Sequence, residues 1–227
     1  MRRVVSDIVG GSIAYDGAGV KLVRVFGHSQ IPQFDPFLLL DAFDSTDSSE
    51  YTKGFPWHPH RGIQTVTYLI KGLIEHSDSL GNKGEIRDGS CQWMVAGSGI
   101  IHTEMPKETP QLLGAQLWIN LPKDQKMTHP TYNEISSDKI QEVIQDQATV
   151  RVISGDYRGH KGAFHNEIVP TLYLDVTLGK NQTWKQEVDP DHTVIIYIIS
   201  LEEVVKALAR VPQYQLPHLV VSPFHQS

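Results

Sequence analysis

The sequence has a single cysteine, Cys91, in 227 residues, so no disulfide can form within the chain. This is typical of proteins from a reducing compartment. Long apolar runs are also missing, because the longest, at 37–40 and 193–199, have the length of strands and cannot span a bilayer as helices. Three residues at the N-terminus include two arginines, but no sufficiently long apolar segment follows, so no secretory signal is predicted. We therefore expect a cytoplasmic protein without a membrane partner; a nuclear location stays open if the source is eukaryotic.

The chain also lacks a basic character. It has 20 Lys and Arg against 26 Asp and Glu, which gives a formal net charge of −6. No basic run of the kind that binds nucleic acid is present. Direct contact with nucleic acid is therefore not expected, whereas a protein partner would leave no such trace in the composition.

Short β-rich segments separated by turns dominate the first half of the chain. Residues 64–70 and 73–79 flank Lys71-Gly72 and are predicted to form a hairpin. Further strands are predicted at 20–27, 37–44, 91–97, 100–106 and 115–122. Many short strands with regular turns favour a β-sandwich or a β-barrel. We therefore predict an all-β domain over residues 1–130.

A second β unit is predicted after a polar, turn-rich linker at 131–147. Strand patterns return at 148–155, 171–178 and 192–199, and the spacing of apolar residues predicts a helix over 201–212. We therefore expect a C-terminal domain over 148–227. This domain has too few predicted strands to close a barrel of its own.

Two pairs of side chains point to metal chemistry. His58 and His60 flank a proline beside a predicted strand, and His102 and Glu104 flank a threonine at the end of another. Residues i and i+2 of a strand face the same side, so each pair can direct two ligand atoms at one point. Three imidazoles and one carboxylate suit Fe(II), and also Mn(II), Ni(II), Cu(II) or Zn(II). A redox-capable metal with open coordination positions allows a protein to handle O2.

The remaining candidates are weaker. The other eight of the eleven histidines lack such pairing and are expected to be exposed or hydrogen-bonded, although His76 is a candidate for contacting a metal ligand. Cys91 is expected to be a small buried residue rather than a reactive thiol. Trp93 or Met94 is expected to line the barrel interior, depending on strand alternation. Glu104 has two open roles, as a ligand only or as a ligand that also serves as general base toward a phenol.

Three segments closely resemble the pirin family of bicupins. They are residues 55–86, 92–106 and 112–122, and the combination of "HPHRG" with "AGSGIIHTE" is specific to that family. The resemblance is nearly continuous from about residue 15 to 125 and looser through 150–159 and 171–178. It implies a cupin-superfamily fold of two stacked β-barrels, the first of which holds a single iron. The implied ligands are His58, His60, His102 and Glu104, all of the expected type.

The resemblance leaves the function open between two classes. Some pirin-like proteins are quercetin 2,3-dioxygenases, which open flavonols with O2 and release carbon monoxide. Others are redox-responsive proteins that bind a protein partner, including nuclear transcription cofactors in animals. The chain is therefore expected to be either a dioxygenase acting on a flavonol-like phenol or an iron-binding regulatory protein. A third reading is a remnant with a folded first barrel and little function.

Two departures from the family pattern are visible. The segment "IRDGS" at 86–90 stands where the family has a turn resembling Gly-Pro-Gly-Asp, which changes a loop but none of the implied ligands. The chain also leaves the family pattern near Ser200. A truncated or frame-shifted product would explain this. The second cupin would then be incomplete, with exposed strand edges that favour association.

Overall fold

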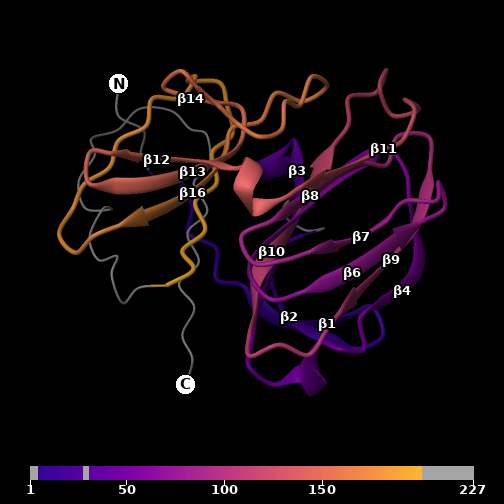
Figure 1. Ribbon diagram of the computed structural model, residues 1–227. Coiled ribbons are helices and arrows are strands. Elements are labelled where there is room, and N and C mark those ends of the chain that lie inside the picture. The colour runs from indigo at the N-terminus through magenta and orange to yellow at the C-terminus, as the bar shows by residue number, and fades with distance from the viewer. Residues whose placement is uncertain (1–4, 28–30, 201–227) are drawn as a thin grey trace.

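The computed structural model describes residues 5–27 and 31–200. Strands dominate these ranges, and the helical pieces are the short segments α1 (Ile31–Phe34), η1 (Ser48–Glu50) and η2 (Ser137–Lys139). No described helix is long and apolar enough to cross a membrane. The first unit consists of two antiparallel sheets packed against each other, and a smaller sheet lies beside it (Figure 1).

The larger sheet of the first unit has seven strands. In spatial order they are β1 (Ser12–Asp16), β2 (Val20–Phe26), β3 (Phe37–Ser45), β10 (Leu112–Asn120), β5 (Ile63–Lys71), β8 (Cys91–Val95) and β11 (Thr131–Ile135). The facing sheet has four strands, in the order β4 (Phe55–His60), β9 (Ile100–Pro106), β6 (Ile74–Asp78) and β7 (Lys83–Ile86). The predicted strands of the first domain are thus confirmed, and β1, β4, β7 and β11 are additional. This arrangement is the expected all-β cupin architecture.

The predicted hairpin across Lys71-Gly72 is wrong. Both runs are strands, but β5 belongs to the seven-stranded sheet and β6 to the four-stranded sheet, so they are not paired with each other. Gly72 has a positive φ of 119°, and its N–H donates to the Asp88 carboxylate at 2.7 Å. The chain therefore uses this glycine to pass from one sheet to the other. A local pattern of two β-rich runs and a turn cannot distinguish these two outcomes.

Strand alternation gives β5 and β8 two different faces. Val66, Tyr68 and Trp93 belong to a core cluster on the outer face of the large sheet, whereas Thr67 and Met94 face the four-stranded sheet. Of the two candidates for the barrel interior, it is therefore Met94 that lies inside. Cys91 is 2% exposed, and burial raises the pKa of its thiol, as expected for a buried apolar residue.

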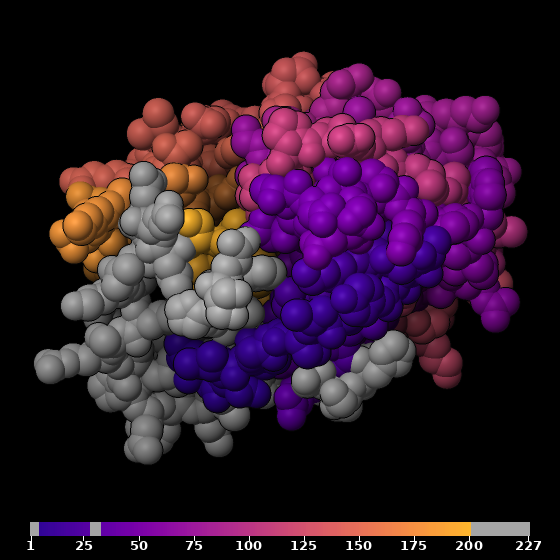
Figure 2. All heavy atoms as spheres, turned by 90° about the horizontal axis from the view of Figure 1, so that it is seen from below, coloured from indigo at the N-terminus to yellow at the C-terminus, as the bar shows by residue number. Residues whose placement is uncertain are grey.

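The second unit covers the outer face of the large sheet. Its own sheet is formed by β12 (Gln141–Gln145), β13 (Ala148–Ser154) and β16 (Tyr173–Leu178), with a small hairpin of β14 (Asp156–Tyr157) and β15 (His160–Lys161). Phe164 stacks on Trp93 with ring centroids 4.7 Å apart. Seen from below, the indigo strands β1 and β2 cross the lower face of the molecule, and the orange second unit gathers on one side of them (Figure 2).

The second half also differs from the expectation. The segment 131–147, expected as a linker, contains β11, which extends the large sheet, and β12, which begins the three-stranded sheet. The strand predicted over 192–199 is wrong, because this segment holds only a one-residue bridge at 198. The helix predicted over 201–212 lies outside the described residues. The domain boundaries proposed at 130 and 148 remain predictions.

A glycine that follows β8 provides a test of how this turn is packed. Gly97 has a φ of 49°, and a Cβ built on it would lie 2.1 Å from the backbone oxygen of Thr128. We expect Gly97→Ala to lower the free energy of unfolding by about 3 kcal/mol, because left-handed strain and a backbone collision add together. The measurement is urea denaturation followed by circular dichroism.

The matched control is Gly62→Ala. Gly62 also has a left-handed φ, of 72°, and donates its N–H to the Gly97 oxygen, but its Cβ would meet only the Lys126 side chain at 3.6 Å. Its expected cost is therefore about 1 kcal/mol, from the backbone conformation alone. Equal losses for the two variants would contradict the packing argument.

Candidate metal centre

The pairing of β4 with β9 brings the predicted histidines together. His58 lies directly opposite His102 in the antiparallel register, and His60 lies opposite Ile100. The intervening residues Pro59 and Ile101 point outward and are exposed. Both predicted pairs therefore sit on the inner face of the four-stranded sheet, as the i, i+2 spacing required.

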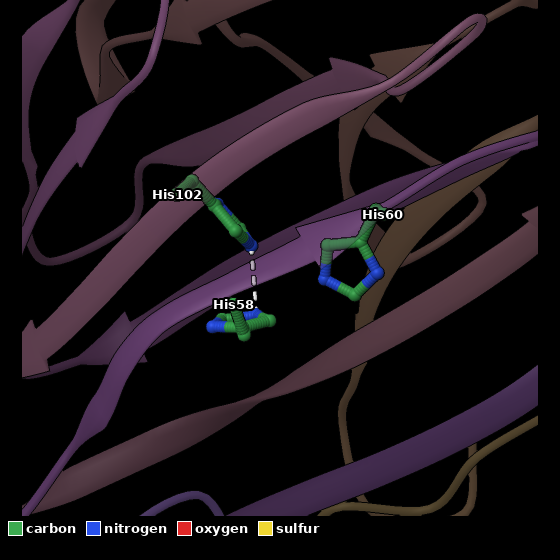
Figure 3. Close-up of side chains that lie close together, drawn as sticks. All are labelled: His58, His60 and His102. Carbon is green, nitrogen blue, oxygen red and sulfur yellow. Dashed lines mark hydrogen bonds between the residues drawn. The ribbon is translucent and has the colours of Figure 1, made fainter.

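The three imidazoles form a compact group. One nitrogen from each ring can be chosen so that all three lie within 4.8 Å of one another. His58 Nε2 and His102 Nε2 are only 3.0 Å apart, and Figure 3 shows this contact with the His60 ring beside it. His102 is fully buried, His60 is 8% exposed and His58 is partly exposed. The group therefore opens toward solvent on the His58 side.

The hydrogen bonds fix the tautomer of His58 and leave one nitrogen of His60 and one of His102 without a partner among the described residues. His58 Nδ1 lies 2.8 Å from the Pro56 carbonyl oxygen, which only accepts, so Nδ1 carries the proton and Nε2 presents its lone pair. His60 Nε2 and His102 Nδ1 are buried and have no hydrogen-bond partner among the described residues. Buried polar atoms without partners are costly. His58 Nε2 faces the His102 ring, and a bound cation would take up the lone pair of this nitrogen.

The distances fit a transition metal. Two imidazole nitrogens bound about 2.1 Å from a metal in neighbouring octahedral positions would lie about 3.0 Å apart, against about 3.4 Å in a tetrahedron. The observed 3.0 Å between His58 and His102 is compatible with two neighbouring ligands, and the nitrogens of the whole group lie within 4.8 Å of one another. Nitrogen donors with further positions free for oxygen are compatible with Fe(II), Mn(II) or Ni(II), and the residues present therefore fit the metal that the cupin fold implies.

Burial keeps His60 and His102 neutral. Burial, followed by the neighbouring His102 and His58 rings, lowers the pKa of His60 to about 3. Burial also lowers the pKa of His102, although the carboxylate of Glu104 opposes this shift. Neutral imidazoles are the form that binds a metal.

Glu104 lies beside the histidine group but not inside it. It is 2% exposed, and its Oε2 is 3.8 Å from His102 Nε2. Its Oε1 accepts a hydrogen bond from the Thr67 hydroxyl at 3.0 Å. The structure therefore places the fourth sequence-predicted residue on the correct face and next to the group. Its role as a metal ligand remains a prediction.

Three other residues around the centre, Trp118, Thr67 and Gln116, have no local signal in the sequence, whereas His76 was a candidate for contacting a metal ligand. Trp118 on β10 packs edge-to-face against His60, with centroids 5.0 Å apart, and Thr67 and Gln116 contact Glu104. His76 lies opposite Glu104 on β6, and its Nε2 is 2.5 Å from Glu134 Oε1. The contacts of Trp118, Thr67 and Gln116 join strands of opposite sheets, so only a knowledge of how the sheets pack would have revealed them.

A β-sandwich of this topology, with histidines gathered between its sheets, is a cupin with a candidate metal centre. The Pirin family model matches residues 19–119. The chain is 43% identical to a pirin-like protein of Caulobacter vibrioides over 86% of its own length and 72% of that protein. It is 40% identical to human pirin over 82% of its own length. The chain therefore belongs to the pirin family.

Solved structures agree with this assignment. A crystal structure of quercetin 2,3-dioxygenase from Acinetobacter baumannii matches 77% of this chain with a TM-score of 0.67 and 33% identity. The match covers 64% of that structure, and the match to human pirin covers 62% of its length. The chain thus spans less than two thirds of human pirin and of the A. baumannii structure, and 72% of the C. vibrioides protein.

The cluster predicts how metal binding responds to substitution. We expect purified protein reconstituted with Fe(II) under anaerobic conditions to hold about one equivalent of metal, and His58→Ala/His102→Ala to hold almost none, because two facing donors are lost. Elemental analysis after gel filtration measures this. His129→Ala, which removes an exposed histidine outside the cluster, should retain the metal. Equal metal content in the double variant and the control would contradict the assignment.

Proposed function

We propose that this protein is a metal-dependent dioxygenase of the quercetin 2,3-dioxygenase type. Its centre would be a mononuclear iron held by His58, His60, His102 and Glu104, and its substrates a flavonol and O2. The observation that carries the proposal is the group of three histidines on the inner face of the sandwich, whose nitrogens lie within 4.8 Å of one another. The 33% identity to the A. baumannii quercetin 2,3-dioxygenase structure supports the choice of reaction.

The positions of the side chains indicate which part of the reaction the metal and the histidines would each serve. The metal, when bound, would supply the redox chemistry that allows O2 to react with a singlet organic molecule, which side chains do not do unaided. The imidazoles of His58, His60 and His102 would hold it. The outcome in the proposed reaction is opening of the flavonol ring by O2 with release of carbon monoxide.

Glu104 would have a second role as general base. Its Oε2 faces His102 at 3.8 Å, whereas its Oε1 already accepts the Thr67 hydroxyl. Oε2 has only a longer contact, from Gln116 Nε2 at 3.5 Å, and is therefore the oxygen that would take a proton from a flavonol hydroxyl beside the centre. A deprotonated flavonol is richer in electrons and easier to oxidise than the neutral phenol.

The surroundings of the centre fit an apolar aromatic substrate. Trp118 and Met94 line the inner face of the large sheet, and Trp118 contacts His60 directly. The partly exposed His58 marks the side from which a ligand would approach. Ligand sites are commonly apolar walls with a few polar groups that fix orientation.

Quercetin turnover tests the proposal. We expect iron-loaded protein under air to consume quercetin, followed by loss of its visible absorbance, and to release one carbon monoxide per flavonol. Glu104→Gln is expected to lower kcat by about 100- to 10,000-fold, because the general base is lost. Glu75→Gln removes an exposed carboxylate that pairs with Lys107 on the outer face and should leave turnover unchanged.

The outcomes separate the two classes of function. Protein that holds iron but leaves quercetin and related flavonols intact under air would overturn the dioxygenase proposal. Such a result would instead fit an iron-binding protein whose redox state alters its affinity for a partner. Protein that binds no transition metal would exclude both.

A further inference from the structure

The large sheet presents a polar row to the metal centre. The strand register places Asp41 on β3 opposite Gln116 on β10, Gln116 opposite Thr67 on β5, and Thr67 opposite Gln92 on β8. All four residues are at most 9% exposed. The space between two packed sheets is normally filled by apolar side chains. Asp41 is bound by Arg24 and Gln92 contacts the Tyr132 hydroxyl, so Thr67 and Gln116 are the two members that need a partner from the opposite sheet.

Glu104 provides that partner from the opposite sheet. The Thr67 hydroxyl donates to Glu104 Oε1 at 3.0 Å, and Gln116 Nε2 lies 3.5 Å from Glu104 Oε2. The Thr67 hydroxyl also lies 3.3 Å from Gln116 Oε1. It has one proton, and the shorter contact assigns this proton to the carboxylate. Both oxygens of Glu104 are therefore contacted by neighbouring residues of the large sheet.

These contacts leave Glu104 with a single orientation. Its Oε1 is directed at the large sheet, so its Oε2 is the oxygen turned to His102, at 3.8 Å. Without the hydroxyl of Thr67, the carboxylate would lose its shortest hydrogen bond, which is the interaction that holds this rotamer. Groups that hydrogen-bond to metal ligands orient them and raise metal affinity.

We propose that Thr67 and Gln116 are positioning residues, which hold the carboxylate of Glu104 toward the histidine group and thereby set the metal affinity of the site. This inference rests on the metal centre of the proposed function but not on the oxygenase reaction. Thr67 has the larger part because its contact is the shorter one.

The chain supplies a matched control. Thr65 lies two residues from Thr67 on the same strand and the same inner face, and each is 1% exposed. The hydroxyl of Thr65 has no hydrogen-bond partner among the described residues. Thr→Val at either position removes one hydroxyl with nearly no change in shape. The two variants therefore differ in whether the lost hydroxyl contacts Glu104.

The experiment titrates the metal-free full chain with Co(II), an air-stable probe, in competition with a coloured chelator. We expect Thr67→Val to weaken Co(II) binding by about 10- to 100-fold and Gln116→Leu by less, with Thr67→Ser returning to within about threefold of wild type. Thr65→Val should stay within about twofold of wild type. The Co(II) absorption spectrum should change in Thr67→Val and not in Thr65→Val.

A double-mutant cycle with Glu104→Ala excludes a general structural effect. If Thr67 acts through Glu104, Thr67→Val weakens Co(II) binding in the wild-type background and has almost no further effect when Glu104 is already removed. Equal losses in both backgrounds, or equal affinities of Thr67→Val and Thr65→Val, would overturn the positioning role.

The results also separate this inference from the proposed function. If wild-type protein binds Co(II) through the histidines and Thr67→Val binds it with the same affinity, the positioning role is refuted. The metal centre is then still supported. A confirmed cycle in protein that does not consume quercetin would support the positioning role and refute the oxygenase. A wild-type chain that binds no Co(II) would overturn the metal centre and the positioning role together.

Discussion

The cross-strand pairing of His58 with His102 is the contact on which the site depends. The register of β4 and β9 sets these residues opposite each other, and the two-residue period of a strand then puts His60 and Glu104 on the same inner face. A shift of either strand by one residue would send its two side chains to the solvent face. The two nitrogens 3.0 Å apart are thus a consequence of backbone hydrogen bonding.

This constraint explains why much of the site was readable from the sequence. The i, i+2 spacing is a local property, and strands at 100–106 and around His58 are indicated by local composition. The facing pairs therefore needed only one further assumption, that the two strands are neighbours. The family resemblance supplied this assumption, and the geometry of the three histidines confirms it.

Properties that depend on the arrangement of sheets were not readable in the same way. The run 64–79 has the pattern of a hairpin, yet β5 and β6 lie in different sheets, because Gly72 allows the chain to cross between them. The contact of Thr67 with Glu104 joins residues that are 37 positions apart and on opposite sheets. The apolar segment 192–199 looks like a strand, but Tyr197 packs against the core cluster outside any sheet. In each case tertiary packing decides between alternatives that local sequence leaves equal.

The same strands that carry the polar row also carry the interface with the second unit. On β5, Thr67 faces the metal centre, while its neighbour Tyr68 faces outward, donates to Asp175 at 2.7 Å and accepts from Arg151 at 3.1 Å. Burial, followed by the charge of Asp175, raises the pKa of the Tyr68 hydroxyl, so it stays a neutral donor.

On β8, Trp93 stacks on Phe164 and donates to Gln64, while Gln92 faces the interior. The second unit therefore acts on the metal barrel as the cover of its outer face, because it buries aromatic side chains that the large sheet would otherwise expose. No described residue of the second unit is part of the histidine group itself, so this unit contributes to the site through the packing of the large sheet.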